Sequence, residues 1–322
     1  MHRFLAVSVL FSFAATAALA SADNGLLALV PATATTVSSI NVQQASSSTL
    51  GQYMLSKMDT DTGFNEFVQQ SGFDPRRDLQ TLVFAGIGQP VAKGQTKFVI
   101  LARGTFPVPW IQQQILSNNG STQNVNGIDL YVHSEHGQSI AFAIPMTGVA
   151  VFGDLASVQQ IIANRANASV LDPALQALIS KISTNNDAWF ASILPGTLLT
   201  DHVNAATNQQ LKPQAQAFQS VRQAAGGILF GDPVAFTFDA ITRSPQDAVS
   251  LSDVVRFAAS FVQLQRQNQP QAQVFASALD GMTLNTSGNE FQASLAVPEK
   301  SLEQLADLGP KAHPHRGFKS AR

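Results

Sequence analysis

Apolar and more polar residues alternate with a period of two in several segments of this chain, and this pattern restricts its fold more than any other. In one stretch Phe236, Phe238 and Ala240 occupy every second position, with Thr237 and Asp239 between them. Successive side chains of a β-strand point to opposite faces of a sheet, so the pattern predicts strands with one apolar and one wetter face. Antiparallel sheets covered by helices on a single face have this character. The same alternation occurs at residues 98–103, 128–133 and 291–297.

Helical periodicity occurs between the strand patterns. The clearest case lies after Ser244, where apolar residues recur at the spacing i, i+3, i+4, i+7 and predict an amphipathic helix over Pro245–Arg266. Ser244 is a suitable N-cap, because its hydroxyl can accept from a free N–H of the first turn and Pro245 suits the first helical position. The residues of the predicted apolar face are Leu251, Val254, Val255, Ala258, Phe261 and Val262.

The predicted elements follow one another in the order β-α-β-β-α-β-β, and this order occurs twice. We therefore predict an α+β fold of two similar lobes, residues 23–183 and 184–308, each an antiparallel sheet covered by helices on one face. Residue identity between the two copies is slight, so a chance grouping of elements is the alternative explanation. Residues 309–322 are basic, contain two prolines and lack apolar periodicity, which predicts a disordered tail.

The first 22 residues have the pattern of a secretory signal peptide. A positively charged start at Arg3 precedes an apolar run over 4–17 and a segment of small residues that allows cleavage after Ala20 or Ala22. An uncleaved membrane anchor is the alternative, although the run is short for a membrane span. No later segment has the length and apolarity of a membrane span, so we expect export to the periplasm or the outside of a Gram-negative bacterium.

Charge and cysteine content exclude several function classes. The formal net charge is −2, which argues against a nucleic-acid binder that relies on a strongly basic surface. The chain has no cysteine, so disulfides, thiol catalysis and thiolate-bound metals are excluded. The sequence also lacks a G-x-S-x-G nucleophile motif and a phosphate-binding loop, and Gly86-Ile87-Gly88 runs into Gln89-Pro90 rather than a helix. We predict no enzyme activity, no catalytic residue and no cofactor.

Two clusters remain as candidate sites. His133, Glu135 and His136 lie near a predicted hairpin turn and have side chains that bind divalent metals, but a solvated hairpin tip is the favoured interpretation. An acidic loop at Asp59 and Asp61 fails the calcium-loop pattern at its later positions.

The run Phe73–Asp78 is the most distinctive motif in the chain. Asp74 can cap a helical turn with Pro75 at its first position, and this leaves Arg76 and Arg77 exposed or locally paired. These two arginines, together with Arg103, are candidates for contact with an anion or a partner. A solvated capped turn is the favoured reading of the run.

Phe73–Asp78 followed by a strand, the segment Leu101–Phe106, and Val151–Asp154 before a helix together carry a resemblance. The chain resembles a group of uncharacterised exported proteins from Gram-negative soil bacteria of the acidobacterial type. The resemblance implies a two-lobed, exported α+β protein, and it brings no known activity, cofactor or site residue with it.

The sequence therefore favours a non-catalytic envelope or periplasmic protein that acts by binding or protein interaction. An alternative is a periplasmic carrier for an apolar ligand such as a lipid, because Phe-rich layers can leave an apolar cavity. An envelope hydrolase is less favoured, since it needs catalytic groups that only the fold could bring together. The expected partner is another envelope protein or an apolar ligand, with no nucleic acid and no membrane span after signal removal.

Overall fold

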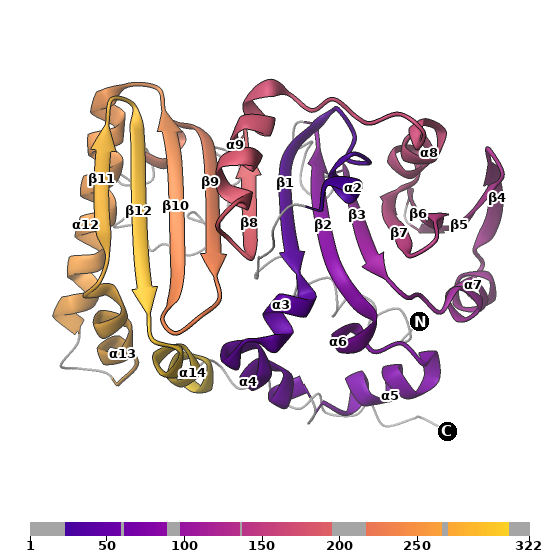
Figure 1. Ribbon diagram of the computed structural model, residues 1–322, viewed down its shortest axis with the longest axis horizontal. Coiled ribbons are helices and arrows are strands. Elements are labelled where there is room, and N and C mark those ends of the chain that lie inside the picture. The colour runs from indigo at the N-terminus through magenta and orange to yellow at the C-terminus, as the bar shows by residue number, and fades with distance from the viewer. Residues whose placement is uncertain are drawn as a thin grey trace.

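The computed structural model describes residues 23–58, 61–88, 97–135, 137–194, 217–265 and 270–308. Within these ranges the chain is an α+β protein built on a 12-stranded sheet, in which every neighbouring pair of strands is antiparallel (Figure 1). The predicted fold class is confirmed. The predicted signal peptide and basic tail lie outside the described residues.

The strand order across the sheet is β11-β12-β10-β9-β8-β1-β2-β3-β7-β6-β5-β4. The strands are β1 (Ala34–Asn41), β2 (Leu79–Ile87), β3 (Lys97–Gly104), β4 (Ser121–Val125), β5 (Ile128–Glu135), β6 (Gln138–Met146), β7 (Val149–Asp154), β8 (Ala188–Ser192), β9 (Val221–Leu229), β10 (Val234–Thr242), β11 (Thr283–Ser287) and β12 (Glu290–Val297). The helices are α2 (Asn24–Leu27), α3 (Val42–Ser47), α4 (Thr49–Met58), α5 (Thr62–Ser71), α6 (Pro75–Asp78), α7 (Val108–Ser117), α8 (Leu155–Asn164), α9 (Pro173–Ser183), α12 (Pro245–Gln265), α13 (Pro270–Leu279) and α14 (Glu299–Leu308).

The two-lobe pseudo-repeat is not confirmed, because the two halves of the chain share one sheet. Strand β1 of the first half pairs with β8 of the second, with Ser38 opposite Phe190. Trp189 and Ala225, from the second half, belong to the same buried cluster as the core of the first half. Helix α9 lies over this junction and contacts β8 and β9. The domain boundaries drawn from the sequence stay predictions.

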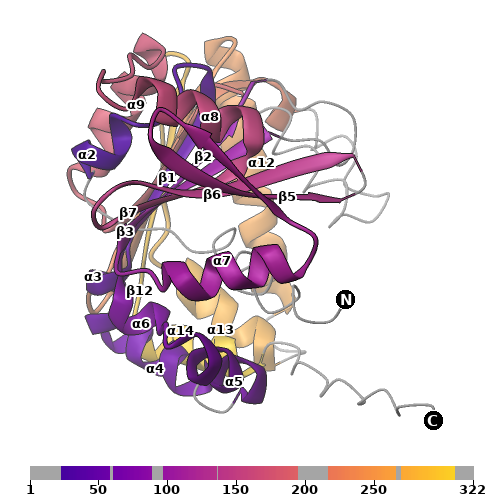
Figure 2. The same ribbon diagram turned by 90° about the vertical axis from the view of Figure 1, so that its right-hand side faces the viewer.

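The first half of the sheet is covered on both faces, which differs from the predicted cover on one face. On one side α2, α8 and α9 pack over a cluster that includes Val99 and Leu101 (Figure 2). On the other side α7 lies over a second cluster that includes Ala102, Tyr131 and Phe142. The reason lies in β3, where Val99 through Ala102 are all apolar and all buried, so neither face of the strand is suited to water.

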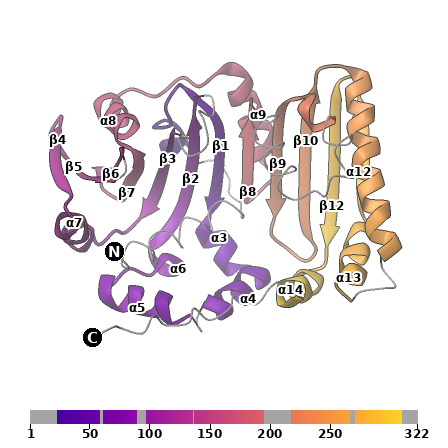
Figure 3. The ribbon, with the colours of Figure 1, turned by 180° about the vertical axis from the view of Figure 1, so that it is seen from behind.

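The outer strands of the second half, β10–β12, have a helix on one face as predicted, whereas α9 covers β8 and β9 on the other face. Helix α12 packs on β10, β11 and β12, and its Ala248 and Leu251 are buried against Phe291. Figure 3, the view from behind, shows α12 in front of the outermost strands. The opposite face of these strands presents exposed polar side chains such as Thr237, Gln292 and Ser294. No helix within the described ranges is long and apolar enough to cross a membrane.

Helix α12 begins as the sequence predicts. The Ser244 Oγ accepts from the Asp247 N–H at 3.2 Å and donates to the Asp247 carboxylate at 2.8 Å, so the predicted N-cap is confirmed. The helix runs to Gln265, and Arg266, the predicted last residue, lies outside the described residues.

Contacts far apart in the sequence join the C-terminal helix α14 to the helices inserted between β1 and β2. The Leu50 N–H, at the start of α4, donates to the buried Glu299 carboxylate at 3.3 Å, and the Tyr53 hydroxyl donates to the Glu303 carbonyl at 3.3 Å. A carboxylate at a helix N-terminus satisfies a free N–H and is favoured by the helix dipole. Helix α14 is thereby joined to the first half.

Candidate functional site

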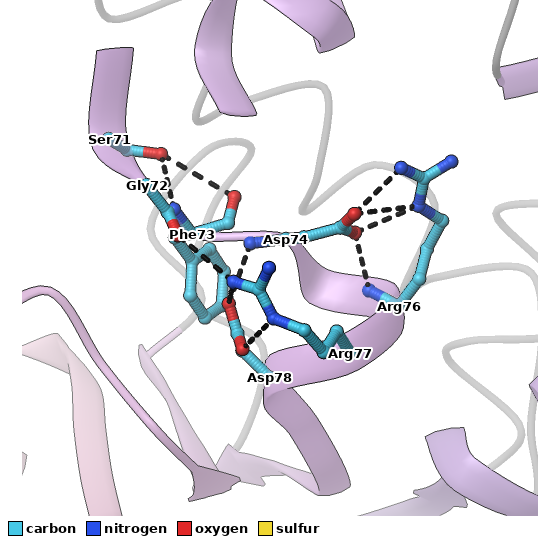
Figure 4. Close-up of polar contacts among 7 residues, drawn as sticks. All are labelled: Ser71, Gly72, Phe73, Asp74, Arg76, Arg77 and Asp78. Carbon is cyan, nitrogen blue, oxygen red and sulfur yellow. Dashed lines mark hydrogen bonds and ion pairs between the residues drawn. The ribbon is translucent and has the colours of Figure 1, made fainter. Parts of the chain in front are cut away.

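The run Phe73–Asp78 forms a capped turn, and its arginines pair within that turn (Figure 4). The Asp74 carboxylate accepts from the Arg76 N–H at 3.0 Å and caps α6, with Pro75 at the first helical position. The same carboxylate accepts from the Arg76 guanidinium at 2.7 Å. That hydrogen bond holds the pKa of Asp74 below its ordinary value, although burial opposes the shift.

Arg77 makes a second pair in the same turn. Its guanidinium lies 2.7 Å from both oxygens of Asp78, and it also donates to the Gly72 carbonyl at 3.1 Å. The hydrogen bond from Arg77 lowers the pKa of Asp78. Asp78 in turn accepts from the Asp74 N–H at 2.8 Å, so the two ion pairs hold one short turn in shape.

Arg103, the third candidate, lies elsewhere. It projects from the end of β3 onto the sheet face that carries α2, where its guanidinium binds both carboxylate oxygens of Asp23, one of them at 2.9 Å. Asp23 also caps α2 by accepting from the Leu26 N–H at 3.0 Å. The structure therefore does not bring Arg103 together with Arg76 and Arg77, and each of the three arginines contacts a carboxylate of this chain.

Of the predicted cluster His133, Glu135 and His136, the structure describes the first two residues. His133 and Glu135 lie near the end of β5, with the His133 Nε2 3.7 Å from a Glu135 oxygen, and His136 lies outside the described residues. Across the described ranges, no group of three or more His, Asp or Glu side chains has the arrangement of a metal site.

Helix α12 also carries an exposed apolar row that its sequence pattern did not reveal, and we call it the α12 stripe: Phe257, Phe261 and Leu264. These side chains are 52%, 55% and 77% exposed, and their spacing of four and three residues places them on one flank of the helix. Phe261 was predicted to face the core, and that prediction is wrong. The buried residues Ala248, Leu251 and Ser252 lie near the N-terminal end of α12, whereas Ala258 and Ser260 towards its C-terminal end are exposed. A helical pattern gives the faces of a helix but not the length over which a neighbour covers them.

A second unforeseen feature is a set of phenylalanines on the sheet face that carries α7 and α12. Phe84, Phe98 and Phe152 form a row across β2, β3 and β7, with ring centroids 6.0 and 6.2 Å apart. Phe190 and Phe238 continue on β8 and β10, 6.3 Å apart across β9.

Gly226 of β9 makes the second pair of rings fit. It lies opposite both Phe190 and Phe238, and a Cβ on it would approach the Phe190 ring to 2.4 Å. The absent side chain gives the Phe190 ring room to lie over the β9 backbone.

Comparisons with known proteins define the fold class and no further class. No protein-family model and no curated protein matches the sequence. Among solved structures, crystal form III of TP0453 matches with a TM-score of 0.50 and 11% identity, covering 88% of this chain and 97% of that one. Crystal form I of TP0453 matches with a TM-score of 0.48 and 11% identity, covering 89% and 98%. At this identity, the similarity to form III shows a shared fold.

Proposed function

We propose that this chain is an exported, non-catalytic binding protein of the bacterial envelope that contacts a partner protein through the α12 stripe. Single exposed apolar residues are common on protein surfaces, but a contiguous apolar row marks an interaction surface. Removing a Phe or Leu side chain from water contributes roughly 1.5–3 kcal/mol, so three neighbouring side chains can anchor a partner.

The polar groups support a binding role over a catalytic one. Catalytic acids and bases are typically held near one another with pKa values shifted towards the working pH. Here the lowered pKa values of Asp23, Asp74 and Asp78 arise from arginines that fix local turns and helix starts. Shifts in this direction keep the carboxylates ionised and structural.

Site-specific photo-crosslinking in cells that export the chain tests the proposal. A photoreactive residue replaces Phe257 in one variant and Val170 in the control, since Val170 is 79% exposed in the loop before α9. We expect one discrete crosslinked partner from position 257 and none from position 170. Adding Phe261→Ser is expected to abolish the crosslink. Identical crosslinks from both positions, or none from 257, would contradict the proposal.

A second candidate function is a carrier for an apolar ligand, and the half-buried row Phe84, Phe98 and Phe152 favours it. In the described residues, α7 and α12 contact the outer strands on this face, and neither makes its main contacts with β2 or β3. Mass spectrometry of organic extracts from protein purified without detergent tests this function. A carrier is expected to yield a stoichiometric lipid that Phe98→Ser loses and Phe257→Ser retains. An extract with no lipid would exclude it.

A further inference from the structure

Among the described residues, strand β11 ends the sheet, and no described strand pairs with its outer backbone edge. It runs from Thr283 to Ser287, contains no charged residue and no proline, and pairs with β12 without a register shift. Its residues Thr283, Asn285, Thr286 and Ser287 are exposed. Edge strands avoid pairing with another chain through shortness, charges, proline, bulges or a covering helix. Strand β11 has five residues and α12 on one face, but it has no charge, no proline and no bulge.

The ladder between β10 and β12 fixes which backbone groups of β11 are open. The Thr242 N–H donates to the Asn289 carbonyl at 2.9 Å. Because backbone groups along a strand point alternately to its two sides, the N–H and C=O groups of Phe291 and Ala293 then point towards β10. The backbone groups of Gln292 and Ser294 therefore point towards β11, where these residues pair with Asn285 and Thr283. The N–H and C=O groups of Leu284 and Thr286 are left pointing outwards.

The other edge of the sheet is built differently. Strand β4 is contacted by α7 and also by α8, and its Gln123 side chain accepts a hydrogen bond from Gln159 of α8 at 3.1 Å. Strand β11 is contacted by α12, and its opposite face belongs to the open polar face of the second half. A second strand can approach β11 with fewer obstacles than β4.

We propose that β11 pairs antiparallel with β11 of a second copy of this chain, about a two-fold axis at Asn285. In this register Leu284 of each copy lies opposite Thr286 of the other, so the outward N–H and C=O groups meet their counterparts. Asn285 faces Asn285 of the second copy, and Thr283 faces Ser287. The two edges are electrically compatible, because neither contributes a charge to the contact.

The proposed dimer is weak and exchanges rapidly. A pair of five-residue strands buries less than the roughly 1,200 Å² typical of a stable interface, so we expect dissociation in the micromolar range. The proposal rests on the backbone edge of β11 and uses no observation of the α12 stripe, so the two proposals have separate tests.

Charged substitutions of Asn285, at the proposed two-fold axis, test the dimer. Asn285→Lys places two like charges opposite each other at an exposed position, and we expect the dimer seen by sedimentation at about 100 µM to be lost. Asn285→Glu is expected to do the same. An equal mixture of the two variants is expected to restore dimers that native mass spectrometry identifies as mixed. Ser294→Lys, on the same open face but in β12, is the control and should remain dimeric.

Thr286→Pro supplies an independent test. Its N–H points outwards and takes no part in the ladder with β12, so proline removes a dimer bond and leaves the sheet intact. We expect a monomer with an unchanged circular dichroism spectrum. A monomeric parent chain at about 100 µM, or dimers that persist in Asn285→Lys, would overturn the proposal.

Discussion

The two halves of the sheet share the alternating strand pattern but differ in which of their faces helices cover. In the first half, helices cover both faces, and β3 is apolar at Val99, Ile100, Leu101 and Ala102 in succession. In the second half, α12 covers one face, and β10 places Thr237 and Asp239 on the other. The polarity of the residues between the apolar positions therefore decides whether helices cover one face of a strand or both.

This contrast extends to what each half offers a partner. In the first half, Arg77 and Asp78 form one of the local ion pairs. In the second half, the described residues present the α12 stripe, a polar sheet face on the outer strands and the sheet edge at β11. Both proposed contacts therefore lie in the second half.

Truncating one buried leucine in each half gives the largest expected effect. Leu101 lies in the core between layers, and we expect Leu101→Ala to cost about 4–5 kcal/mol of unfolding free energy, because surrounding side chains cannot collapse into the space. Leu251→Ala is expected to cost about 2–3 kcal/mol, because α12 packs on one layer and can shift. Urea denaturation measures both. An equal or larger loss in Leu251→Ala would show that the second half is packed as tightly as the first.

Glycines on the same sheet face provide the next test. A Cβ at Gly226 would lie 2.4 Å from the Phe190 ring, so we expect Gly226→Ala to destabilise the protein by about 1–3 kcal/mol. At Gly86, in the first half, the nearest atom to a Cβ is Thr36 Cβ at 3.6 Å, an ordinary contact. Gly86→Ala is expected to be neutral or to stabilise by about 0.4–1 kcal/mol. Thermal unfolding should show a lower midpoint for Gly226→Ala and an unchanged or higher midpoint for Gly86→Ala, and equal losses would contradict the role given to Gly226.

The features that depend on near neighbours in the chain are the ones that the sequence predicts. It predicted the α+β class, the start of α12 at Ser244 and the capped turn at Asp74, because each depends on neighbours within a few residues. It did not predict the shared sheet, because the pairing of Ser38 with Phe190 depends on residues far apart in the chain. It placed Phe261 in the core for the same reason: helical spacing does not reveal where the covering strands end.

Ion pairs give a smaller effect with a defined pH dependence. The hydrogen bond from Arg103 holds the pKa of Asp23 below its ordinary value of 3.8, with burial opposing it. A lowered acid pKa stabilises the fold above the unfolded value, and the contribution is lost as pH falls through the folded value. We expect Arg103→Gln to cost about 1–2 kcal/mol at pH 7 and progressively less below pH 3.8.

The matched pair is Lys181 of α9, which lies at the junction and binds two carboxylates of the second half. It lies 2.6 Å from Glu290 and 3.1 Å from Asp239, and its hydrogen bond lowers the pKa of Glu290. The Lys181 side chain is 47% exposed, so solvent screens the pair and we expect Lys181→Gln to cost at most about 0.5 kcal/mol at pH 7. Urea denaturation at pH 7 and pH 3 compares the two variants. A larger loss of unfolding free energy in Lys181→Gln than in Arg103→Gln would contradict the expected order of the two ion pairs.

Removing the α12 stripe is expected to have the smallest effect on stability. Phe257 and Leu264 are 52% and 77% exposed, so Phe257→Ser and Leu264→Ser should each change the unfolding free energy by less than about 0.5 kcal/mol. Leu251→Ala, on the buried face of the same helix, is the control for a real packing loss. A loss above about 2 kcal/mol in Phe257→Ser, measured by urea denaturation, would mean that the side chain is packed in solution. The stripe would then belong to the core of the second half, and the proposed partner contact would lose its main observation.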